Sequence, residues 1–227
     1  MVLRPKDLSK MIDNTLLDAT ASVDEIKELC QGAREYQFAA VCVNPIFVSL
    51  CHRLLEDTSV KVCTVVGFPL GANTIETKAY EACMAIKNGA RELDMVINLG
   101  AIKSKAYQLA REDIKAVVEA PNALGINSEV ITKVIIETCY LSEEEIKRAC
   151  LLVQEAGADF VKTSTGLGPA GAREEDIILI RQVIGREIGV KAAGGIRSFD
   201  DAARMVNAGA NRIGTSSGLQ LVTGKNA

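Results

Sequence analysis

Short apolar segments rich in β-branched residues alternate with longer amphipathic segments along the whole of this 227-residue chain. The short segments have the pattern of buried parallel strands, and the longer ones have the pattern of helices that cover them. We predict strands at residues 14–17, 39–43, 61–66, 92–97, 131–137, 159–163, 189–192 and 212–214. We predict helices near 22–36, 45–56, 74–88, 100–120, 142–156, 173–186 and 198–208, and a short helix before the first strand.

Eight strands alternating with helices in a chain of this length favour an α/β fold of the closed (β/α)8 type, a TIM barrel. A doubly wound open sheet is the alternative. A weak internal repeat supports the barrel, because Asn88-Gly89-Ala90, Ala156-Gly157-Ala158 and Ala208-Gly209-Ala210 each end a helix and lead into a strand. Ser22, Asn73, Ser142 and Ser198 are the expected helix N-caps. No linker interrupts the pattern, so we expect a single domain over residues 1–227.

Composition excludes several classes of function. The 26 Lys and Arg residues against 29 Asp and Glu residues give a net charge of −3, without a basic cluster, and tryptophan is absent. Nucleic acid is therefore not an expected partner. No apolar run has the length of a signal peptide core or a membrane span, so we expect no membrane association. The seven cysteines include no CxxC pair, which favours a reducing, cytoplasmic setting.

One lysine lies in an apolar strand, where burial of its charge is unfavourable. Lys162 follows the apolar residues Phe160 and Val161 and precedes Thr163-Ser164-Thr165-Gly166. A buried ammonium group is unfavourable, so a lysine in a strand often has a neutral, nucleophilic state to use. The alternative is a side chain that extends to solvent from the end of the strand.

Other strands carry charges on the same kind of face. Side chains alternate along a strand, so Asp94 points away from its apolar neighbours, and Lys133 and Lys191 have corresponding places in their own strands. If these faces point inward, the barrel encloses three lysines and a carboxylate. Barrel interiors are normally filled by branched apolar side chains, so the cluster indicates a function.

The residues that are missing narrow the chemistry. Histidine occurs once, as His52 in a helix-like segment, so we expect neither a Ser-His-Asp triad nor a zinc site. No GxGxxG or GxxxxGK[ST] motif is present, and we expect no cofactor and no metal. The mechanism that remains needs no cofactor: a lysine forms a Schiff base with a carbonyl substrate. Such a lysine must lose its proton, which a second ammonium group nearby favours, and Lys191 and Asp94 are the expected partners of Lys162.

Three turns have the composition of a phosphate site. Residues 193–197 and 214–218 follow the last two predicted strands, where barrels commonly bind phosphate, and Thr165-Gly166 makes a third turn on the same rim. Their glycines and hydroxyl residues offer backbone N–H groups to an anion.

The chain resembles the deoxyribose-phosphate aldolase family of class I aldolases. The resemblance lies in Ile12–Leu17, Ala40–Val43, Val66–Gly71, Glu92–Asp94, Lys133–Thr138, Asp159–Gly166, Lys191–Arg197 and Gly214–Ser217. It implies Lys162 as the Schiff-base lysine, Lys191 as its activating partner and Asp94 as the proton-relay acid. It further implies substrate contacts from Asp13, Thr15, Cys42, Lys133 and Thr165. It implies phosphate contacts from Gly166, Gly194, Gly195, Gly214, Ser216 and Ser217.

The resemblance implies reversible cleavage of 2-deoxy-D-ribose 5-phosphate to D-glyceraldehyde 3-phosphate and acetaldehyde, by a homodimer or homotetramer. Two residues depart from the family pattern: Asn14 stands where histidine is frequent, and Leu167 where some members place a lysine. Two other functions stay open from the sequence. One is a related lysine aldolase or transaldolase on another sugar phosphate, and the other is a catalytically silent sugar-phosphate-binding barrel.

Overall fold

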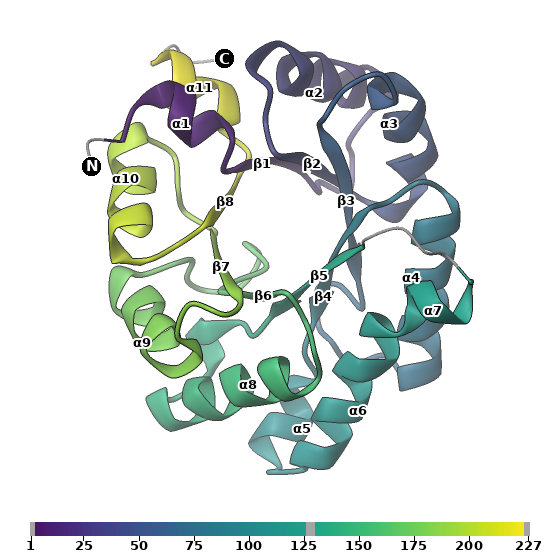
Figure 1. The fold of residues 1–227 in the computed structure, drawn as a ribbon, viewed down its shortest axis with the longest axis vertical. Helices are drawn as coiled ribbons and strands as arrows, with labels where there is room; N and C mark the ends of the chain where they lie inside the picture. The colour runs from purple at the N-terminus through teal and green to yellow at the C-terminus, as the bar shows by residue number, and fades with distance from the viewer. Residues whose placement is uncertain (1–2, 126–129, 225–227) are drawn as a thin grey trace.

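The eight strands form a closed parallel barrel in which each strand pairs with the next along the chain and β8 pairs with β1 (Figure 1). This computed structural model describes residues 3–125 and 130–224. Within these ranges the strands are β1 (Ile12–Leu16), β2 (Ala40–Val43), β3 (Lys61–Val66), β4 (Glu92–Val96), β5 (Ile131–Ile135), β6 (Phe160–Lys162), β7 (Gly189–Ala193) and β8 (Arg212–Thr215). The (β/α)8 prediction is confirmed, and the open-sheet alternative is wrong.

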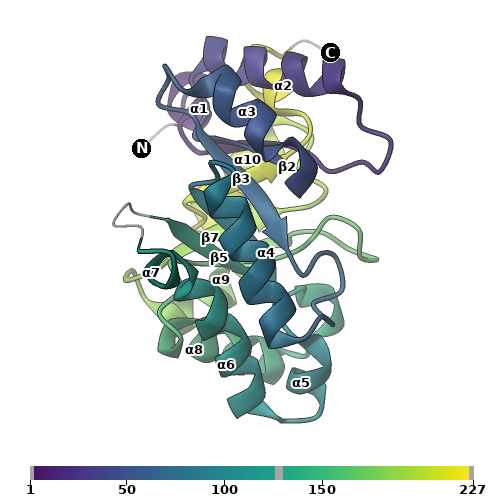
Figure 2. The same cartoon turned by 90° about the vertical axis from the view of Figure 1, so that its right-hand side faces the viewer.

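Helices form the outer layer around the barrel (Figures 1 and 2). They are α1 (Pro5–Ser9), α2 (Val23–Tyr36), α3 (Val48–Leu55), α4 (Ile75–Lys87), α5 (Leu99–Lys103), α6 (Tyr107–Val118), α7 (Ala120–Ala123), α8 (Glu143–Glu155), α9 (Glu174–Ile184), α10 (Phe199–Ala208) and α11 (Gly218–Thr223). Two 3-10 turns, η1 (Pro45–Phe47) and η2 (Thr138–Tyr140), follow β2 and β5. The first and last helices, α1 and α11, pack against each other.

The helix predicted near 100–120 is three helices, α5 to α7. Lys105 has a left-handed backbone (φ 57°), which no α-helix can include, and it separates α5 from α6. The cap predictions for Ser22, Ser142 and Ser198 are confirmed, since each side chain accepts from the backbone N–H three residues on in a capping box. The prediction for Asn73 is wrong, because Thr74 caps α4.

The apolar core lies between the barrel and the helices. Outward-facing strand residues such as Val41, Leu93 and Val161 pack there against helix residues such as Ile26 and Ile146, all of them buried. Burial of such side chains contributes roughly 1.5–3 kcal/mol each. The inside of the barrel contains charged side chains, since its buried residues include Asp13, Glu92 and the three predicted lysines. The fold therefore gathers a group of charged side chains in the interior of the barrel.

None of the helices in the described residues is both long and apolar enough to cross a membrane.

Candidate active site

A pocket of about 230 Å³ opens at the carboxyl ends of the strands. Lys162, the last residue of β6, reaches it from below with a side chain that is 3% exposed. The pocket is lined by Thr15, Leu17, Asp18, Phe68, Lys162, Thr165, Gly166, Leu167, Ala193, Gly194, Gly195, Ile196, Arg197, Gly214, Thr215 and Ser216. The lysine is therefore buried and yet accessible to a small molecule in the pocket.

Asp94 is the point at which the three interior lysines meet. The Nζ atoms of Lys162 and Lys191 each lie 2.7 Å from Oδ2 of Asp94. The Nζ atom of Lys133 lies 2.9 Å from Oδ1 of the same carboxylate. The strand register explains the meeting, because Lys133 pairs with Asp94 across β4 and β5, and Lys162 pairs with Lys191 across β6 and β7.

Asp94 and Lys191 hold each other in their charged forms. Burial alone would raise the pKa of Asp94, but the surrounding ammonium groups outweigh it and hold that pKa well below its usual value. Burial would lower the pKa of Lys191, but the carboxylates of Asp13 and Asp94 outweigh it, and the pKa of Lys191 is raised. Lys191 is consequently an ammonium group at neutral pH, and it shares its carboxylate oxygen with Lys162.

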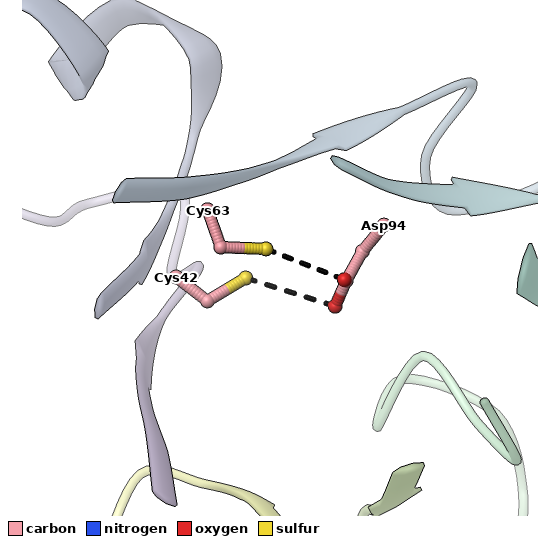
Figure 3. A group of neighbouring side chains, drawn as sticks. All are labelled: Cys42, Cys63 and Asp94. Carbon is pink, nitrogen blue, oxygen red and sulfur yellow. Dashed lines mark hydrogen bonds between the residues drawn. The ribbon is translucent and has the colours of Figure 1, made fainter. Parts of the chain in front are cut away.

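Two thiols lie against Asp94 on the side of β2 and β3 (Figure 3). The Sγ atoms of Cys42 and Cys63 are 4.0 and 3.3 Å from its two oxygens. These three groups have donor types that soft cations use. Every carboxylate oxygen here already accepts from a lysine, so a cation would have to displace an ammonium group. We therefore interpret the thiols as part of a packed polar layer.

The predicted substrate residues lie at two levels. Thr15 and Thr165 line the pocket. Asp13, Cys42 and Lys133 are fully buried below it, around Asp94. Asn14 points the opposite way, out of the barrel, where a Cβ added at Gly218 of α11 would be 2.6 Å from its Oδ1. The histidine that Asn14 replaces would therefore not reach the pocket from this strand position.

The predicted phosphate turns meet at the rim of the pocket. Gly166 and Gly194 both line the pocket and have left-handed backbones (φ 90° and 88°), which glycine adopts without strain. A Cβ at Gly214 would lie 3.0 Å from Cε of Lys191, so glycine leaves room for that lysine. Gly195 and Ser216 also line the pocket, whereas Ser217 lines a separate hollow beside α2 and α11.

Glu137 supports the site, and the sequence did not predict this role. Its backbone is left-handed (φ 52°), which ends β5 at Ile135, short of the predicted boundary at Glu137. Its buried carboxylate accepts from the backbone N–H of Thr165 at 3.2 Å. Glu137 thereby fixes the turn that carries Gly166. The acceptor could not be read from the sequence, because a left-handed glutamate has no local signature.

Glu92 and Arg212 were also missed. Both point into the barrel, and each is the first residue of its strand, β4 and β8. The signal was available, because Glu92 is two residues before Asp94 and Arg212 two residues before Gly214, on the same faces.

Fold and site together define the class: a (β/α)8-barrel enzyme with a lysine below a pocket at the carboxyl ends of its strands. Residues 7–224 match the model of the DeoC/LacD family of aldolases. The chain belongs to this family and is a lyase of the aldolase type.

Individual relatives agree. The deoxyribose-phosphate aldolase of Caldanaerobacter subterraneus subsp. tengcongensis is 57% identical over 216 residues, which cover 95% of this chain and 92% of the relative. That of Carboxydothermus hydrogenoformans is 56% identical over 217 residues, 96% and 94% of the two chains. The solved tetrameric deoxyribose phosphate aldolase from Aeropyrum pernix superposes with a TM-score of 0.88 at 34% identity, covering 96% of this chain and 90% of that one.

Proposed function

We propose that this enzyme reversibly cleaves 2-deoxy-D-ribose 5-phosphate to D-glyceraldehyde 3-phosphate and acetaldehyde through a Schiff base on Lys162. The observation that carries the proposal is the place of Lys162, which lies at the base of the pocket and contacts Asp94 at 2.7 Å. The names of relatives at 56 and 57% identity support the choice of substrate.

The first half of the reaction forms the electrophile. The neutral amine of Lys162 attacks the aldehyde carbon C1 of the open-chain sugar, and loss of water gives a protonated imine. The Lys191 ammonium group, which donates to the same oxygen of Asp94, disfavours a second positive charge there. It therefore favours the neutral, reactive amine.

The second half breaks the carbon chain. The C3 hydroxyl loses its proton, the C2–C3 bond electrons move into the imine, and D-glyceraldehyde 3-phosphate leaves. The remaining enamine is protonated at C2, and water releases acetaldehyde and the free lysine. We assign the proton transfers to Asp94, directly or through water, with Lys191 as its neighbour. Asp94 is suited to this because its position is fixed by three lysines.

The glycine turns are assigned to the phosphate. Gly166, Gly194, Gly195, Gly214 and Ser216 line the same pocket as Lys162, and Arg197, which is exposed, also lines it. Thr15 and Thr165 also line the pocket, and we assign their hydroxyl groups to the sugar. Ser217 contributes through the turn itself, because its N–H donates to Oγ1 of Thr215 at 2.9 Å.

We further propose a homodimer or homotetramer in the cytoplasm. The tetrameric Aeropyrum pernix relative supports an assembly. Exposed apolar side chains on outer helices, such as Tyr80 of α4 and Leu109 of α6, could bury surface in it. The seven cysteines are all unpaired, as suits a reducing compartment.

The test is an assay of purified enzyme with 2-deoxy-D-ribose 5-phosphate, with both products identified. Release of acetaldehyde and D-glyceraldehyde 3-phosphate is expected. Turnover of another sugar phosphate in its place would favour the related-aldolase alternative, and binding without turnover would favour a silent binding barrel.

A further inference from the structure

The interior of the barrel contains a closed ring of ion pairs in which cations and carboxylates alternate. Its members, in order around the ring, are Asp94, Lys191, Asp13, Arg212, Glu92 and Lys133. All of these residues belong to the barrel strands. Lys162 is outside the ring and is attached to it through Asp94 alone.

The upper part of the ring lies directly below the pocket. Lys191 bridges two carboxylates, with its Nζ atom 2.7 Å from Asp94 and 2.5 Å from Asp13. Both acids and the lysine are fully buried. This part holds the oxygen to which Lys162 also donates.

The lower part closes the ring from the amino ends of the strands. Arg212 donates to Asp13 at 2.6 Å and to Glu92 at 3.1 Å, and Lys133 lies 2.6 Å from Glu92 and 2.9 Å from Asp94. β4 and β8, which supply Glu92 and Arg212, lie on opposite sides of the barrel (Figure 1), so these two side chains meet across its axis.

Arg212 is itself held in place. Its guanidinium group lies 5.7 Å from the ring centroid of Phe160, a cation–π distance. Phe160 in turn packs on Gly189, where a Cβ would lie 2.1 Å from the aromatic ring. The lower part of the ring therefore has one packed arrangement.

The ring as a whole carries no net charge. Three cations and three carboxylates cancel, so Lys162 is one cation attached to a neutral frame. We propose that Glu92 and Arg212 are positioning residues of the aldolase reaction: they complete this frame, hold Asp94 and Lys191 in register, and set the charge that acts on the Schiff-base lysine. The proposal rests on the proposed role of Lys162.

Other charged and titratable groups also lie around Lys162 and the pocket. The barrel strands and the loops beyond them contribute Asp13, Asp18, Cys42, Cys63, Glu92, Asp94, Lys133, Lys191, Arg197 and Arg212. Asp18 and Arg197 lie on the pocket wall in contact with solvent and are screened. The other five ring residues are buried and the Arg212 side chain is only 12% exposed, so a change in a ring charge reaches Lys162 with less screening than a change on the pocket wall.

Two substitutions give opposite expected results. Glu92→Gln removes a negative charge, leaves the frame at +1 and favours neutral Lys162, so the pH midpoint of its reaction should fall. Arg212→Gln leaves the frame at −1 and should raise the midpoint. We expect shifts of about one pH unit, the effect of a unit charge roughly 12 Å away at an effective dielectric constant of ~20. The double variant restores neutrality and should return the midpoint to that of wild type.

The measurement is the rate of borohydride trapping of substrate on Lys162 as a function of pH, read by mass spectrometry, with thermal unfolding recorded for each variant. Arg212→Lys keeps the charge and should keep the midpoint. The exposed pair Arg34 and Asp57, 2.5 Å apart, supplies matched control variants, Arg34→Gln and Asp57→Asn, for which no shift is expected. If Glu92→Gln or Arg212→Gln does not fold, Asp13→Asn and Lys133→Gln repeat the same two charge changes within the ring.

The outcomes separate the two proposals. Opposite shifts that cancel in the double variant support the ring. Shifts of one sign, or lower stability with an unmoved midpoint, would overturn the positioning role while leaving the Schiff base intact. Absence of any adduct on Lys162 in the wild-type enzyme would instead overturn the proposed function.

Discussion

Lys162 and Lys191 donate to one and the same atom, Oδ2 of Asp94, at 2.7 Å each. Their nitrogens are therefore neighbours in the buried interior of the barrel, below the pocket. Two ammonium groups at that separation repel each other, and Lys191 is the one that two carboxylates keep protonated. The difference between the two lysines lies in their partners, since Lys162 contacts one carboxylate and Lys191 contacts two.

Replacement of Lys191 by methionine should shift activity to higher pH. The substitution removes the positive charge next to Lys162 and leaves Asp13 and Asp94 with less compensation, and both effects favour the charged, unreactive form of the nucleophile. We expect the pH midpoint of kcat/KM to rise by about one unit or more. Profiles of wild-type and Lys191→Met enzymes check this, and an unchanged midpoint would contradict the activating role.

Replacement of Asp94 by asparagine should cost stability as well as activity. It leaves Lys162 without its one carboxylate partner and removes one of the carboxylates around Lys133 and Lys191, an effect of about 3–5 kcal/mol. Because the folded-state pKa of Asp94 lies below that of the unfolded chain, its contribution is fully present above pH ~4 and is lost only as the pH falls through the folded value. Denaturant unfolding from pH 3 to 8 checks this, and a difference that disappears near neutral pH would refute it.

Most of the fold could be predicted from the sequence because apolar strand segments and amphipathic helix segments alternate along the chain. Strand positions could be predicted to within about two residues, since a parallel strand buried on both faces is a continuous apolar run that few other elements produce. The left-handed backbones at Lys105 and Glu137 could not be predicted, because neither residue type favours that conformation.

The site could be predicted in part for a related reason. Lys162, Lys191 and Asp94 were visible as charges in apolar strands, and alternation gave their faces. Their convergence on one oxygen depends on the register of the closed barrel, which a sequence does not state. Glu92 and Arg212 share the faces of Asp94 and Gly214, but their places at the starts of β4 and β8 are equally typical of surface residues.

The buried pair Lys78 and Asp113 lies outside the barrel, between α4 and α6, with its charged atoms 2.5 Å apart. Burial lowers the pKa of Lys78 and raises the pKa of Asp113 despite their attraction, so the site disfavours the charged form of each residue. Lys78→Met alone should destabilise the protein by about 3–5 kcal/mol, whereas Lys78→Met with Asp113→Leu should restore most of it. Chemical denaturation of the three proteins checks this, and an equal loss in the single and double variants would contradict it.

Leu167 lines the pocket next to Gly166, a proposed phosphate contact, and its side chain is largely exposed (66%). Leu167→Lys adds a cation near the expected phosphate, and an exposed pair of this kind contributes up to about 1 kcal/mol, or roughly a fivefold lower KM. The KM for an unphosphorylated deoxyribose should not change, and Leu167→Met serves as the uncharged control. A similar gain for both substrates would argue that position 167 does not face the phosphate.

The identity of the nucleophile is the central claim, and one experiment addresses it directly. The enzyme is treated with borohydride in the presence of 2-deoxy-D-ribose 5-phosphate or acetaldehyde, and the modified residue is located by peptide mass mapping. We expect a single adduct on Lys162, absent from Lys162→Met, which should also lose at least about 10³-fold in activity. An adduct on Lys133 or Lys191 in place of Lys162, or full activity in Lys162→Met, would contradict the account.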